Sequence, residues 1–136
     1  MSFDWTTYFD LSKVLYQEAT TQDGPLVEAK LRSAISRAYY AAHHKALRYV
    51  EATQRGVYIS RGGKAHREVV DHLKGSRKHE DQVAGNLLDR VLTAREKADY
   101  KAFPGNMKAA IREHLKINCW NMISWRRIVS MKFLTL

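Results

Sequence analysis

The stretch SRAYYAAHHKAL, residues 36–47, lies within a long segment that has a helical pattern throughout. Between Pro25 and Thr53 no glycine or proline interrupts the chain, so a single helix is expected over this segment. Its apolar face includes small alanines that allow close helix contact, and a polar stripe occupies the opposite face. The members of the apolar face are Leu31, Ile35, Ala38, Tyr39, Ala42, Ala46 and Tyr49.

The rest of the chain also predicts helices, separated by short breaks rich in glycine, proline and polar residues. We expect them at about 3–20, 65–74, after the turn at 75–81 as far as Tyr100, and at about 106–131. No internal repeat divides the 136 residues. The predicted fold is therefore all-α: an antiparallel bundle of four to five helices that forms one domain over residues 1–136.

Charge and cysteine content restrict the partners and the compartment. The formal net charge is +9, which favours an anionic partner such as nucleic acid or an acidic protein. Cys119 is the only cysteine, as expected for the reducing cytosol. No apolar run approaches the roughly 18 residues of a transmembrane helix, and no signal pattern opens the chain. We expect a cytoplasmic protein that does not enter membranes.

The polar stripe of the long helix groups residues that suit phosphate chemistry. Arg37 and His44 share a face about 10 Å apart along the axis, with Tyr40 beside them, whereas His43 falls about 120° away from Arg37. Imidazole serves as acid or base near neutral pH, and guanidinium binds phosphate. Two such pairs facing each other across a two-fold axis would supply every group that RNA cleavage without metal needs. The alternative is a solvated polar stripe, which amphipathic helices generally have.

Two separated motifs resemble one protein family. The segment LRSAISRAYYAAHHKAL (residues 31–47) is similar to the tyrosine-rich helix of HEPN domains, the higher-eukaryote and prokaryote nucleotide-binding helical domains. The second motif, LTAREKADY (residues 92–100), is similar to a later segment of the same branch. The resemblance covers nearly the whole chain and implies a HEPN-like bundle that usually dimerises.

The resemblance also implies an activity and a partner. Many HEPN proteins are metal-independent ribonucleases with an Arg-x(4–6)-His motif, which corresponds here to Arg37 and His44. They often act as toxins or in defence, frequently with a nucleotidyltransferase-like antitoxin. The family's aromatic residue before the histidine is His43 here. Its later Arg-x(4)-His motif has no histidine here, and Arg95 and Asp99 are spaced to pair on the helix surface.

Three interpretations of the nuclease centre therefore stay open. It consists of Arg37 and His44, or it is a composite that includes Arg95 and Tyr100, or it is absent. Tyr40 and Asp99 are further possible members. Packing in the core is the alternative for the two tyrosines.

A basic segment follows the long helix. Arg55, Arg61, Lys64 and Arg67 lie around the glycine-rich loop, where they suit an RNA backbone; a solvated, mobile basic loop is the alternative. No His-Glu-x-x-His motif or Cys/His cluster occurs, so we expect neither metal nor cofactor.

The sequence thus supports two functions. The first is a metal-independent endoribonuclease of HEPN type, a homodimer acting on RNA such as tRNA or mRNA. The second is a non-catalytic HEPN-like module that binds a nucleotide or a partner within a larger assembly.

Overall fold

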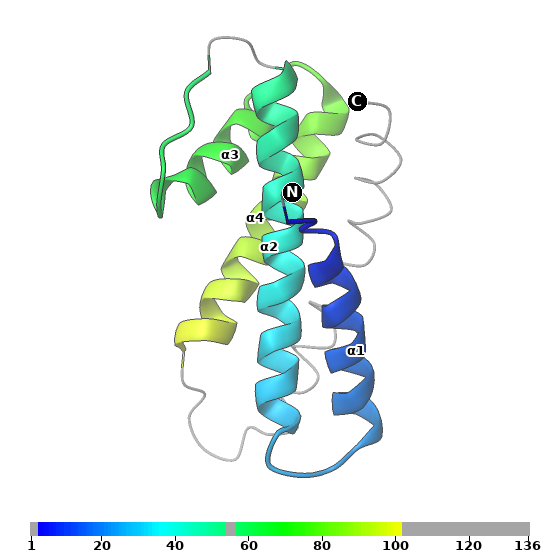
Figure 1. Ribbon diagram of the computed structural model, residues 1–136. Helices are drawn as coiled ribbons and strands as arrows, with labels where there is room; N and C mark the ends of the chain where they lie inside the picture. Colours follow the sequence, from blue (N-terminus) through cyan, green and yellow to red (C-terminus); the bar gives the residue numbers. More distant parts are fainter. Residues whose placement is uncertain (1–2, 54–56, 102–136) are drawn as a thin grey trace.

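The computed structural model describes residues 3–53 and 57–101, and this part of the chain is all-α. Within it lie four helices and no strand (Figure 1). They are α1 (Thr7–Thr21), α2 (Val27–Thr53), α3 (Lys64–Lys74) and α4 (His79–Tyr100). The expectation of a helical bundle is confirmed for these residues.

Helix α2 is the centre of the bundle. Helices α1 and α4 both run antiparallel to it and pack against it, while the short α3 packs mainly against α4 (Figure 1). The apolar face predicted for α2 is buried: Leu31, Ile35 and Tyr39 are at most 1% exposed. The alanines between them let the neighbouring backbones come close, so α2 contributes half of the buried apolar core. The fully buried large side chains are Tyr39, Phe9, Leu31, Ile35, Leu73, Leu88, Val50, Val69 and Val70.

The helix boundaries follow the sequence pattern with one notable difference. The first helix begins at Thr7 rather than near Phe3. The Asp4 carboxylate accepts hydrogen bonds from the backbone N–H and the hydroxyl of Thr6, at 3.0 and 2.6 Å. These local bonds hold the chain in a turn before the helix starts, as short polar side chains often do. The helix expected at 106–131 lies outside the described residues.

Arg32 ties the end of α4 to α2. Its Nη1 donates to the backbone carbonyls of Ala98 and Lys101 at 2.6 and 3.0 Å. Its Nε pairs with Glu28 one turn earlier on α2. A cation at the carbonyl end of a helix satisfies unpaired acceptors and complements the helix dipole. This contact places the last turns of α4, which carry Arg95, Asp99 and Tyr100, beside α2.

Gly85 allows α3 and α4 to pack closely. A β-carbon at position 85 would lie 2.8 Å from the backbone nitrogen of Lys74 and 3.0 Å from Cβ of Leu73. We therefore expect Gly85→Val to lower the free energy of unfolding by about 1–3 kcal/mol through overpacking, measured by urea denaturation. The matched control is Asn86→Val, which places the same side chain at the next, exposed position of α4. Equal losses for the two variants would contradict the packing explanation.

Candidate functional site

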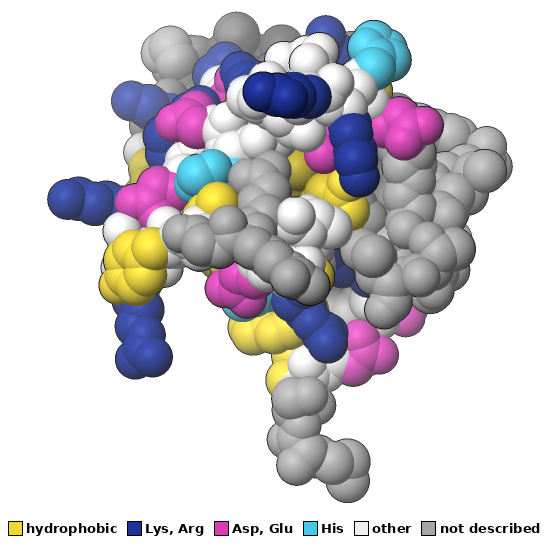
Figure 2. Space-filling model, turned by 90° about the horizontal axis from the view of Figure 1, so that it is seen from above, with side chains coloured by type: hydrophobic (Ala, Val, Ile, Leu, Met, Phe, Trp, Pro, Cys, Tyr) yellow, Lys and Arg dark blue, Asp and Glu magenta, His cyan; other side chains and the backbone are white. Residues whose placement is uncertain are grey.

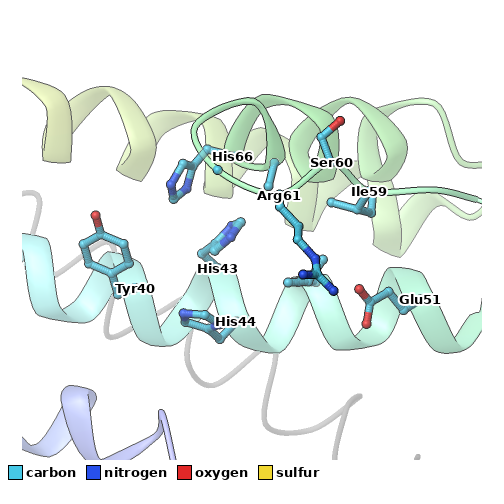
Figure 3. Close-up of a pocket in the computed structure, with 11 residues that line it drawn as sticks. Tyr40, His43, His44, Glu51, Ile59, Ser60, Arg61 and His66 are labelled. Atoms are coloured by element: carbon cyan, nitrogen blue, oxygen red, sulfur yellow. The ribbon is translucent and has the colours of Figure 1, made fainter.

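An open cavity of about 390 Å³ lies between α2, α3 and the loop that joins them (Figure 3). Its size is in the usual range for a small ligand. One wall comes from α2 and the other from residues 59–66, so the two walls are brought together only by the fold. The lining residues are Tyr40, His43, His44, Leu47, Glu51, Ile59, Ser60, Arg61, Gly62, Ala65 and His66.

Three imidazoles converge at one end of this cavity. The rings of His43 and His66 have centroids 4.3 Å apart, and those of His43 and His44 are 5.4 Å apart. Burial, and then the neighbouring His66, lowers the pKa of His43 to about 3 and that of His44 below its usual value. Burial, with Arg95 next in importance, also lowers the pKa of His66. All three rings are therefore neutral at pH 7, and the lowered pKa makes His43 in particular a poor proton acceptor.

Tyr39 is the hydrogen-bond partner of His66. The Tyr39 hydroxyl lies 2.6 Å from Nδ1 of His66, and burial raises the pKa of this phenol above its usual value. The phenol therefore keeps its proton, and the direction of this hydrogen bond follows the tautomer of His66. In the tautomer in which the phenol donates to Nδ1, the imidazole proton is on Nε2, which is left as a hydrogen-bond donor.

His44, the predicted catalytic histidine, has one covered face. Its ring stacks on Trp5 with centroids 3.6 Å apart and an angle of 15° between the planes. The side chain is half-buried and also lines the cavity. Parallel stacking covers a ring face and leaves the edge with its nitrogen atoms available, so the indole fixes the ring without blocking its proton chemistry.

Arg37, the predicted partner of His44, lies outside the cavity. Its guanidinium is 4.9 Å from the centre of the Tyr8 ring and donates a hydrogen bond to the Tyr8 hydroxyl at 3.3 Å. Tyr8 in turn packs edge-to-face on Trp5, with ring centroids 5.4 Å apart. Arg37 contacts Tyr8 and His44 contacts Trp5. Both side chains thus face the same N-terminal aromatic pair, as their shared helix face predicted.

The other predicted members of the site gather around Arg95. Its Nη2 donates to the hydroxyls of Tyr40 and Tyr100 at 2.6 and 3.4 Å. Its Nε is 2.9 Å from Oδ2 of Asp99, which confirms the pairing expected from their spacing; the N–H is not aimed at the oxygen, so the contact is an ion pair rather than a hydrogen bond. Since Tyr40 lines the cavity, Arg95 reaches the cavity through this phenol.

His66 is the residue that sequence reasoning missed. It is close to the start of α3, three and seven positions before the buried Val69 and Leu73. Residues at these spacings share a helix face. The apolar pattern of α3 therefore contained a signal that His66 points inward.

The predicted RNA-binding residues differ in their surroundings. Arg61 lines the cavity, Lys64 is exposed at the first position of α3, and Arg55 lies outside the described residues. Arg67 pairs with Asp89, which also pairs with Lys74. Figure 2 shows Lys and Arg side chains interspersed with acidic ones over the end of the bundle seen from above. Among these four, Arg61 and Lys64 form no ion pair with a described residue and are available to a polyanion.

The described residues contain neither a metal-binding cluster nor a membrane-spanning helix. Residues 3–53 and 57–101 contain no group of three His, Cys, Asp or Glu side chains that could hold a metal ion. Over the same ranges, no helix combines the length and the apolar character needed to cross a membrane.

Comparison with known proteins found no match among family models, curated proteins or solved structures. The HEPN resemblance thus rests on the two sequence motifs and stays a prediction. The chemistry of the cavity is the remaining basis for a function.

Proposed function

We propose that this chain is a metal-independent endoribonuclease of HEPN type. The observation that carries the proposal is the open cavity in which a half-buried, neutral His44 lies beside a second imidazole and an Arg-bonded phenol. These groups are the ones that cleavage of a phosphodiester by the neighbouring 2′-hydroxyl requires. The reaction needs a base, an acid and donors to the phosphate oxygens.

Each group has a role in this proposal. His44 accepts the proton of the 2′-hydroxyl, whose oxygen then attacks the adjacent phosphorus and forms a 2′,3′-cyclic phosphate. Tyr40 receives an N–H bond from Arg95 on its oxygen, so its own proton is free to be donated to the leaving 5′-oxygen. His66 donates Nε2–H to a phosphate oxygen. Arg37, exposed on the α1 side of His44, holds a neighbouring phosphate of the RNA chain.

The wider proposal follows the family resemblance. It describes a cytoplasmic homodimer in which two sites act on one RNA, such as tRNA or mRNA. It also includes a role as a toxin or defence component controlled by a nucleotidyltransferase-like antitoxin. The +9 charge supports an RNA partner.

The test is incubation of the purified full chain with end-labelled RNA in EDTA. We expect products that end in a 2′,3′-cyclic phosphate and begin with a 5′-hydroxyl, formed at the same rate with and without the chelator. Cleavage that requires added Mg²⁺, or products with 5′-phosphate ends, would contradict the mechanism.

One observation favours the second function, a non-catalytic module that binds a nucleotide or a partner. The family's later motif has a histidine five positions after its arginine, and this position is Tyr100 here, whose hydroxyl accepts a hydrogen bond from Arg95. RNA binding in a gel-shift assay, without cleavage in any condition, would support this module.

A further inference from the structure

The cavity has three chemically different zones along α2. The imidazoles and Tyr40 occupy one end. Leu47 lies on α2 between His44 and Glu51, and Ile59 and Ala65 add apolar side chains to the opposite wall. Glu51 and Arg61 form a charged far end, and Figure 3 shows the Arg61 side chain reaching from the loop toward α2 on the side of Glu51.

This order matches the parts of a nucleotide. His44 and Glu51 are seven positions apart, so they share a face of α2 and are separated by about 10 Å along its axis. A nucleotide spans a comparable length from its phosphate to the far edge of its base. With the phosphate at the imidazoles, the base would lie in the apolar middle and its far edge would meet Glu51 and Arg61.

Glu51 is unexpected in a cavity that attracts a polyanion. The chain is strongly basic, and a carboxylate in the cavity wall repels phosphate. Within residues 3–53 and 57–101 no cation forms an ion pair with Glu51, whereas Glu28 on the same helix and Asp89 on α4 are paired. A carboxylate in this position is explained if it accepts hydrogen bonds from a base.

The loop before Arg61 is held on α3 by Ser60. Glu68 accepts two hydrogen bonds from the preceding Ser60, one from the backbone N–H and one from the hydroxyl, both at 2.7 Å. These bonds fix the loop on α3. The Arg61 side chain is exposed and reaches toward the Glu51 side of the cavity (Figure 3).

The two charged groups together select one base. The Watson–Crick edge of guanine offers two donors, N1–H and N2–H, to a carboxylate, and its O6 and N7 accept from a guanidinium. Adenine and cytosine each offer one donor and place a ring acceptor against the carboxylate. Uracil offers one N–H between two carbonyls. Bases of single-stranded RNA are recognised through these edges.

We infer that the cavity is a guanine-specific nucleotide site in which Glu51 binds the N1–H and N2–H donors and Arg61 binds O6 and N7. The inference rests on the proposed function for the orientation of the nucleotide. In that orientation the guanine belongs to the nucleotide whose 2′-hydroxyl attacks, so RNA is cut on the 3′ side of G.

Binding of the four 3′-mononucleotides to the full chain, measured by isothermal titration calorimetry, tests the base preference without any cleavage. We expect 3′-GMP to bind roughly 10- to 100-fold more tightly than 3′-AMP, the discrimination typical of a bidentate contact. Glu51→Gln should remove most of this preference, because an amide accepts one N–H and repels the other. The control Asp23→Asn alters an exposed acid at the opposite end of α2 and should retain the preference.

Equal affinity for the four nucleotides, or a preference that survives in Glu51→Gln, would overturn the inference. The two proposals fail separately. Cleavage in EDTA at all four nucleotides leaves the ribonuclease and removes the guanine site. Selective 3′-GMP binding without cleavage of any RNA leaves the guanine site and removes the ribonuclease.

Discussion

Replacing His44 with alanine should lower the rate of RNA cleavage by about 10²–10⁴-fold, the usual contribution of a general base. The imidazole is neutral at pH 7 because burial, and then His66, lowers its pKa, and its edge is available to the cavity. The measurement is the single-turnover rate on labelled RNA in EDTA. RNA affinity should change much less than the rate, since the base acts on the reacting proton rather than on the phosphate chain.

Two histidine variants separate this role from a general loss of structure. His79→Ala removes an exposed imidazole at the start of α4 and should leave the rate within about twofold, since changes of surface residues away from a site have small effects. Far-ultraviolet circular dichroism would establish that both variants keep the helical bundle. If His44→Ala cleaves as fast as the unaltered protein, His44 is not the base and the mechanism fails.

Arg37 gives a different kind of result in the same assay. Because its guanidinium lies on Tyr8 rather than in the cavity, Arg37→Ala should weaken RNA binding and leave the cleavage step of bound RNA nearly unchanged. This contrast between the two residues follows from the structure, since the sequence placed them in one pair.

The periodicity of the long helix explains why so much of the fold was predictable. The buried face of α2 and its end at Thr53 follow from helical spacing and from the absence of glycine and proline between Pro25 and Thr53. Spacing within one helix also predicted the pairing of Arg95 with Asp99. Such local relations depend only on the geometry of the helix itself.

The contacts between site residues on different helices were harder to predict from the sequence. His66 on α3 meets Tyr39 and His43 on α2, and Arg95 on α4 meets Tyr40 on α2. Each contact depends on how the helices pack, which one sequence does not define. The stack of Trp5 on His44 depends in addition on the turn at Asp4, where the sequence pattern suggested a continuous helix.

The buried His43 should make the protein progressively less stable as the pH falls from about 6.5 to about 3. Burial is the main reason that its pKa falls to about 3, followed by His66, His44 and Arg95. The unfolded chain binds a proton at this residue below about pH 6.5, whereas the folded chain does not until about pH 3. Protonation therefore favours unfolding in this range, by up to about 1.4 kcal/mol per pH unit for one group.

His43→Phe isolates this contribution, because it keeps an aromatic ring on Tyr39 and removes the titrating group. The side chain is 4% exposed, and its Nδ1 has no hydrogen-bond partner among the described residues, so the variant leaves no described donor or acceptor newly unpaired. The measurement is the free energy of unfolding from urea denaturation at about pH 4.5, 5.5, 6.5 and 7.5, which span roughly the titration range. As the pH falls, this free energy should decrease more steeply for the unaltered protein than for His43→Phe. Parallel pH profiles would mean that the folded protein takes up the proton at His43 as readily as the unfolded chain. The effect of burial on the pKa of His43 would then be absent from the folded protein.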